Sequence, residues 1–154
     1  MYTLEDIRVN IQPIPQTVRA LDRQPLALTP DSKFCFVAPS VEKGPIKTAV
    51  EGLRVFFAKI WGEDCFCDSG TKVRLALDTA PEEVKNPEEA YRITVDIGGI
   101  TVTGFGEKGL YYGVTSLLQL CRGRGSEFCI PAVEILDWPD RAIRSFKQEC
   151  RYGS

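Results

Sequence analysis

A glycine-rich turn is the first group of residues in this sequence whose types and spacing could carry chemistry. Gly104, Gly106 and Gly109 form a G-x-G-x-x-G pattern between an expected strand and an expected helix. In a dinucleotide-binding turn, backbone amides and a helix N-terminus receive the pyrophosphate, and an acidic residue follows the next strand, where this chain has Asp137. However, the preceding strand is the second arm of a hairpin, and Glu107 places a negative charge where phosphates would lie. We therefore interpret these glycines as a tight strand-to-helix turn, with nucleotide binding as the alternative.

Six cysteines are the second such group. Three stand in apolar runs and are expected to be buried, inert side chains: Cys35, Cys121 and Cys129. Cys65 and Cys67 are spaced too closely for a usual zinc site, and the sequence contains no histidine. The missing histidine also excludes Ser-His and Cys-His nucleophilic pairs. We expect inert cysteines, no metal and no cofactor, with a disulfide or a metal site as the alternatives.

The composition indicates a single globular domain. The chain has 154 residues, of which 44% are hydrophobic and 26% are charged. Its formal net charge of −2 gives no electrostatic reason to expect nucleic acid or a membrane surface as a partner. No apolar stretch approaches the ~20 residues of a membrane span. Glu5 and Asp6 stand where a signal peptide would carry basic residues, so we expect no export signal, which favours a cytoplasmic location.

The elements that position these residues follow from apolar periodicity. The first 30 residues show little pattern beyond an extended segment at 11–16 and a turn at 22–25. Residues 33–38 are apolar on both faces, which predicts a strand in the middle of a sheet. Pro45 suits the first turn of a helix that ends at Trp61-Gly62, with apolar positions recurring every three or four residues. Residues 72–78 alternate and predict a strand, and residues 79–89 predict a loop. The apolar positions of the 72–78 strand face the core: Val73, Leu75 and Leu77.

Residues 91–103 give the clearest local signal, that of a β-hairpin. Two alternating runs flank Gly98-Gly99, which we expect to form a two-residue turn. In that register Val95 faces Val102 and Ile97 faces Ile100, so one face of the hairpin is apolar.

A second helix is predicted over residues 107–121 and a last strand over residues 132–136. The expected buried stripe of this helix consists of Leu110, Val114, Leu117, Leu118 and Cys121. The order strand, helix, three strands, helix, strand predicts an α/β (α+β) fold in which two main helices pack on a mixed sheet.

Three segments of this sequence resemble a known family. Residues 11–16, IQPIPQ, are similar to an opening I-x-P-x-P segment, and residues 109–120, GLYYGVTSLLQL, are similar to a helix signature G-x-F/Y-Y-G-x-x-T-L-x-Q-L. Residues 130–144 match a closing I-P-x-x-x-I-x-D-x-P…R pattern. Together they resemble the N-terminal, non-catalytic domain of glycoside hydrolase family 20, the β-N-acetylhexosaminidases. Families 84 and 89, which share this accessory domain, fit the same pattern.

The resemblance implies a zincin-like accessory domain over residues 1–138 that buttresses a catalytic (β/α)8 barrel. Residues 139–154 would then be a linker and the start of the first barrel strand, and the barrel would be the domain's partner. Catalysis in this family depends on an adjacent Asp-Glu pair, and no Asp-Glu dipeptide in that order occurs here. The chain itself is therefore expected to be non-catalytic, and carbohydrate would be bound through the parent protein.

Arg144 is the one residue to which the resemblance assigns a sugar contact. It stands where the family has an arginine that reaches hydroxyls of the non-reducing sugar, a task that suits a guanidinium fork. Ser145 and Glu149 replace the Gly and Asp of the family pattern, which leaves open an altered substrate or an inactive parent. Without a barrel to pair with, the tail from about Asp140 is expected to fray or to take a conformation set by contacts outside the domain.

Three aromatic residues could form a sugar-stacking surface: Tyr111, Tyr112 and Trp138. Adjacent tyrosines on a helix point to different faces, however, so one of the pair is expected to pack on the sheet with its hydroxyl at the rim. We therefore expect these aromatic residues to serve packing rather than sugar binding.

Overall fold

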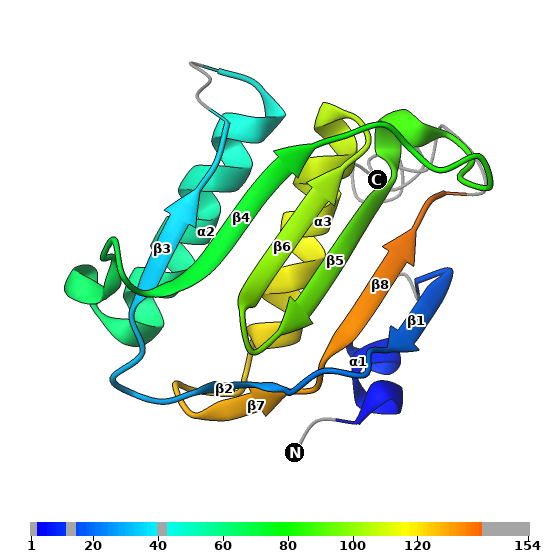
Figure 1. Cartoon of the computed structure of the whole chain (residues 1–154). Coiled ribbons are helices and arrows are strands. Elements are labelled where there is room, and N and C mark those ends of the chain that lie inside the picture. Colours follow the sequence, from blue (N-terminus) through cyan, green and yellow to red (C-terminus); the bar gives the residue numbers. More distant parts are fainter. Residues whose placement is uncertain (1–2, 12–14, 40–42, 140–154) are drawn as a thin grey trace, which may run out of the picture.

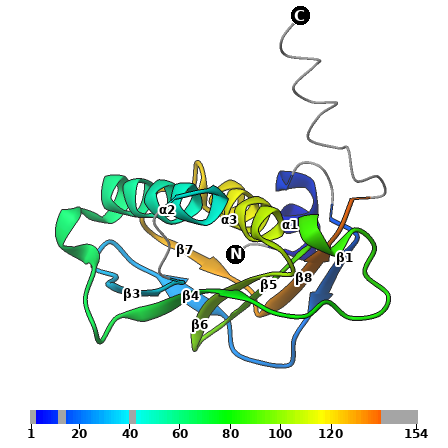
Figure 2. The same ribbon diagram turned by 90° about the horizontal axis from the view of Figure 1, so that it is seen from above.

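The computed structural model describes residues 3–11, 15–39 and 43–139 (Figure 1). A sheet of six strands is covered on one face by three helices, and its other face is open (Figure 2). The helices are α1 (Leu4–Asn10), α2 (Pro45–Trp61) and α3 (Glu107–Cys121), with short 3₁₀ turns η1 (Glu63–Cys65) and η2 (Pro87–Glu89). The strands are β1 (Thr17–Ala20), β2 (Leu26–Leu28), β3 (Phe34–Val37), β4 (Thr71–Leu77), β5 (Tyr91–Asp96), β6 (Gly99–Gly104), β7 (Phe128–Ile130) and β8 (Val133–Asp137).

The large sheet is mixed, as the sequence predicts. Its strand order is β1-β8-β5-β6-β4-β3, in which β3, β4 and β6 are parallel and the remaining pairs are antiparallel. Strands β2 and β7 form a separate two-stranded sheet. The expected fold class, a mixed sheet with two main helices packed on it, is confirmed. Among the described residues, no helix is both long and apolar enough to cross a membrane.

Helix α2 forms where its sequence predicts. Pro45 occupies the first turn, and Gly62 ends the helix with a φ of 97° and a hydrogen bond from its N–H to the Ala58 carbonyl at 2.8 Å. The predicted apolar stripe packs against the core: Leu53 and Phe57 are fully shielded from solvent, whereas Val50 and Ile60 are partly buried. The Phe57 ring packs edge-on against Phe34 of β3 at 4.7 Å between centroids, which ties the helix to the edge of the sheet.

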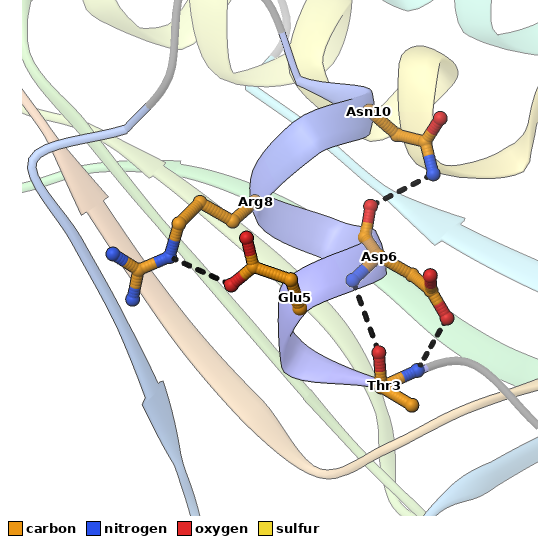
Figure 3. Close-up of polar contacts among 5 residues, drawn as sticks. All are labelled: Thr3, Glu5, Asp6, Arg8 and Asn10. Atoms are coloured by element: carbon orange, nitrogen blue, oxygen red, sulfur yellow. Dashed lines mark hydrogen bonds and ion pairs between the residues drawn. The ribbon is translucent and has the colours of Figure 1, made fainter.

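Helix α1 is an element that the sequence analysis did not predict. A capping box begins it: the Asp6 N–H donates to Thr3 Oγ1 at 3.1 Å, and the Thr3 N–H donates to Asp6 Oδ2 at 2.9 Å (Figure 3). The backbone hydrogen bond with Thr3, followed by the bond with its hydroxyl, lowers the pKa of Asp6. Only Ile7 within this helix is buried, and the apolar positions Leu4, Ile7 and Ile11 span too few turns to mark a helix clearly in the sequence.

The hairpin forms, but its predicted register is wrong. Val95 pairs with Ile100 and Asp96 with Gly99, so Ile97 and Gly98 make the turn and Ile97 is 62% exposed. Gly99 belongs to the strand because its φ of 131° and its close approach to the Lys72 carbonyl leave no room for a side chain. The slip spans two positions, so every apolar side chain of the paired strands keeps its face.

Three further expectations are wrong in detail. Strand β3 lies at the edge of the sheet instead of its middle, so its apolar run is only partly covered and Val37 is 42% exposed. Leu77 was expected to face the core but is 46% exposed, because it ends β4. Leu118 is half-buried, and Leu120 takes its place in the core.

Candidate functional site

Polar groups meet at the end of strand β8 in a cluster that we call the Asp137 junction. Its members are the buried side chains of Tyr91, Ser116 and Asp137 and the backbone N–H of the exposed Gln16. Tyr91 Oη lies 2.6 Å from Ser116 Oγ and donates to Asp137 Oδ2 at 3.4 Å. Because a phenol carries one proton, Ser116 donates to Tyr91 in this arrangement. The cluster therefore links β5, α3 and β8 through a chain of hydrogen bonds.

Strand register and the close packing of α3 bring these groups together. Tyr91 is paired with Asp137 in the β5–β8 register, so the two side chains start from neighbouring positions. Gly113 of α3 lets the helix approach, since a Cβ there would lie 3.1 Å from the Tyr91 Cβ. Ser116 follows three residues later on the same buried face of α3, where its hydroxyl meets the phenol. The sequence analysis missed Tyr91 and Ser116 as polar core residues, although Ser116 interrupts the predicted apolar stripe.

The opposite side of the junction holds the segment after β8. Gln16 donates its backbone N–H to Asp137 Oδ1 at 3.1 Å and its Nε2 to the Trp138 carbonyl at 3.1 Å. Asn86 Nδ2 donates to the Pro139 carbonyl at 2.8 Å. Both carboxylate oxygens of Asp137 accept hydrogen bonds, and the residue is only 3% exposed. The junction thus fixes the direction of residues 137–139, and protein donors contact both oxygens of its carboxylate.

Trp138 belongs to a second, smaller apolar cluster on the open face of the sheet. It packs with Leu136 and with the segment between β4 and β5. The members of this cluster are Ala80, Val84, Ala90, Phe105, Leu136 and Trp138. Tyr112 packs against the main core on the helical side instead, with the Tyr111 ring 5.9 Å from its own. The structure therefore does not join the tyrosines and Trp138 into one sugar-stacking surface.

The three glycines of the G-x-G-x-x-G pattern make internal contacts. A Cβ at Gly106 would lie 2.5 Å from Glu88 Oε2, and a Cβ at Gly104 would lie 2.5 Å from the Leu110 Cβ. At Gly109 a Cβ would overlap the Ala90 carbonyl oxygen. The interpretation as a tight strand-to-helix turn is confirmed, and the nucleotide-binding alternative finds no support, because protein atoms fill the space that a pyrophosphate needs.

Arg144 lies outside the described residues, as does the predicted tail from Asp140. Its proposed sugar contact stays a prediction. Within the described ranges, no group of three or more His, Cys, Asp or Glu side chains could hold a metal ion.

The five cysteines within residues 3–139 are free thiols in different surroundings. Cys121 is buried as predicted, and burial raises its pKa to about 12. Burial also raises the pKa of Cys65, whereas the side-chain hydrogen bond with Ser69, at 3.3 Å, lowers the pKa of the exposed Cys67. Cys35 and Cys129 are only half-buried, so the expectation of full burial is wrong for both, because each lies on a strand at a sheet edge.

We expect iodoacetamide to alkylate Cys67 first among these five cysteines. Because its pKa is lowered, Cys67 has a larger thiolate fraction than an ordinary thiol at any pH below the pKa of an ordinary thiol. Its side chain is also open to the reagent. Cys121 should react only after unfolding. Peptide mass spectrometry of timed samples measures the order, and Ser69→Ala should slow Cys67 alone. Labelling of Cys121 at the rate of Cys67 in native protein would contradict this prediction.

Comparison with known sequences gives one family match. The family model described as "Glycosyl hydrolase family 20, domain 2" matches residues 8–138. Among curated proteins, none matches this chain. The family match covers the helix signature and most of the closing pattern from which the resemblance was inferred, so that inference is confirmed.

Solved structures share the fold over most of this chain. The N-acetyl-β-hexosaminidase of Streptomyces plicatus has a TM-score of 0.66 and 22% identity, and the match covers 90% of this chain and 28% of that one. The β-N-acetylhexosaminidase of Bacteroides fragilis has a TM-score of 0.55 and 26% identity, and the match covers 84% of this chain and 25% of that one. The chitobiase of Flavobacterium johnsoniae has a TM-score of 0.60 and 21% identity, and the match covers 85% of this chain and 21% of that one. The chain thus spans about a quarter of the length of these structures.

Proposed function

Since the chain belongs to the domain family "Glycosyl hydrolase family 20, domain 2", we propose that it is a non-catalytic domain. In this proposal it buttresses the catalytic barrel of a β-N-acetylhexosaminidase-like enzyme. The observation that carries this proposal is the family match over residues 8–138. The matched structures are about four times longer, which leaves room for a catalytic domain outside the shared segment. The Asp137 junction supports the proposal, since it fixes the direction in which the chain leaves β8.

The outer surface of the helical layer is the side that we propose to contact the barrel. Val55 of α2 is 67% exposed and Tyr111 of α3 is 38% exposed, although both are large apolar or aromatic side chains. Gly52, one turn before Val55, has no neighbouring atoms around its Cβ position, so another domain could approach the α2 backbone there. Apolar side chains that lie uncovered on two neighbouring helices suit a contact with another domain.

Residues 139–154 are proposed as the linker and the start of the first barrel strand, with residues 1–138 as the accessory domain. In that arrangement Arg144 would reach the sugar from the barrel, as the resemblance implies. The parent's substrate class would be N-acetylhexosaminides, since the matched structures are named as enzymes acting on such sugars.

Two measurements test this proposal. The purified chain should give no turnover of 4-nitrophenyl N-acetyl-β-glucosaminide at any pH, because it contains no dipeptide in the order Asp-Glu. A complete family 20 enzyme under the same conditions is the positive control. The gene should continue beyond Ser154 into a barrel pattern that includes an Asp-Glu pair. Turnover by the chain alone, or a stop codon directly after Ser154, would contradict the proposal.

A further inference from the structure

Apart from the smaller apolar cluster around Leu136 and Trp138, the open face of the sheet carries polar and basic side chains, whereas the helical face carries the main core. Alternation along the strands places Val73, Ile93 and Val102 under the helices. The residues between them point to the open side. Thr94 and Thr101 are cross-strand partners there, and Arg74 is the partner of Thr101 on β4. These three side chains therefore form a row across three neighbouring strands.

A pocket of about 220 Å³ lies on this face beside the row. Its polar lining consists of Arg23, Lys72, Arg74, Thr94, Asp96 and Thr101. Gly99 lines the hollow between its two strand partners, Lys72 and Asp96. The volume is below the ~300 Å³ at which pockets for drug-sized ligands begin, so it suits a group about as large as one sugar ring.

The charges around this pocket do not balance. Asp96 supplies the one carboxylate of the pocket lining, and it forms an ion pair with Arg23 at 2.9 Å. Lys72 and Arg74 are exposed and form no ion pair with any described residue. The pocket thus holds an excess of positive charge in a chain whose net charge is −2. An exposed basic pair beside two hydroxyl groups is complementary to a ligand that combines an anionic group with hydroxyls.

We propose that this open face binds an anionic glycan. Lys72 and Arg74 hold its carboxylate or sulfate group, while Thr94 and Thr101 exchange hydrogen bonds with its hydroxyls. The choice of a glycan over another polyanion rests on the proposed function, whereas the requirement for an anion rests on the pocket alone. The helical layer faces the barrel in that proposed function, so the open sheet face remains accessible.

Binding of the chain to immobilised chondroitin sulfate, polygalacturonate and neutral dextran tests this inference. We expect saturable binding to the two anionic glycans, weakened by salt, and none to dextran. Lys72→Gln with Arg74→Gln should raise the Kd by about tenfold or more, because two charge-assisted contacts are lost. Thr101→Val should raise it by a smaller factor without changing the charge.

The matched control replaces two basic residues of the helical layer, Lys47→Gln with Lys59→Gln, which alters the net charge equally and should leave the Kd unchanged. Absence of binding by the unaltered chain, or an equal loss in this control, would overturn the proposal. Equally tight binding of duplex DNA through Lys72 and Arg74 would overturn the assignment to glycans. The turnover and gene-continuation tests are independent of these results, so a failure here is distinguishable from a failure of the proposed function.

Discussion

Replacing Gly109 by alanine should lower the free energy of unfolding by about 3 kcal/mol, at the upper end of what overpacking costs. The added Cβ would overlap the carbonyl oxygen of Ala90 and lie 2.8 Å from its carbonyl carbon. These are backbone atoms of the residue just before β5, so they cannot rotate away as the end of a side chain could. Relief requires α3 to move away from the sheet, which would weaken the packing of Leu110 and Val114.

Gly52→Ala is the matched control. It is the same substitution in a helix, and apart from the adjoining residues and backbone of the helix itself no atom lies within 4 Å of the new Cβ. Alanine there should raise stability by about 0.5–1 kcal/mol through helix propensity. Urea unfolding followed by tryptophan fluorescence and circular dichroism measures both variants. The prediction requires that the two substitutions change the free energy of unfolding in opposite directions. A Gly109→Ala variant as stable as the unaltered chain would show that the close approach of α3 to Ala90 is wrong.

Asp137→Ala should destabilise the domain by about 2–3 kcal/mol. The substitution leaves the Gln16 N–H and the Tyr91 hydroxyl without the carboxylate that accepts from them, and the site is too buried for water to replace it freely. Glu134→Ala on the same strand is the control. Glu134 forms an ion pair with Arg19 at 2.9 Å on the exposed surface, where such pairs contribute under about 1 kcal/mol.

A double-mutant cycle separates the network from a general loss of packing. If Tyr91 and Asp137 act through their hydrogen bond, the double variant Tyr91→Phe with Asp137→Ala should lose less free energy of unfolding than the two single variants lose together. Urea midpoints of the four proteins measure the coupling. The Asp137 junction would not fix the end of β8 if the losses of stability in the two single variants were strictly additive. The same would follow if Glu134→Ala lost as much stability as Asp137→Ala.

The two faces of the sheet suggest a division of roles within the proposed parent enzyme. The helical layer exposes Val55 and Tyr111 and suits contact with another domain, whereas the open face carries Lys72 and Arg74 around a pocket. The Asp137 junction lies at the end of β8, where the chain passes toward residue 140. Its stability would therefore influence how firmly this domain is joined to the proposed barrel.

The sequence alone determined the elements whose apolar residues repeat with a clear period. Helix α2, helix α3 and the alternating strands β4 to β6 lie where that period predicts, because burial of one face leaves a regular mark in the local sequence. The family resemblance was also readable, since the residues of its helix signature are contiguous. Helix α1 and strand β1 are short and mostly exposed, so the mark that burial leaves in their sequences is too short to identify them.

Only the tertiary structure decided how distant segments pair. Strand β1 exists because Thr17 lies beside Leu136, and β3 is an edge strand because the chain returns to place β4 and β6 on one side of it. The hairpin register depends on Gly99 meeting the backbone of Lys72, a residue outside the hairpin. The Asp137 junction and the basic pocket likewise combine side chains from separate strands and helices. Such contacts depend on the path of the whole chain, and local periodicity carries no information about that path.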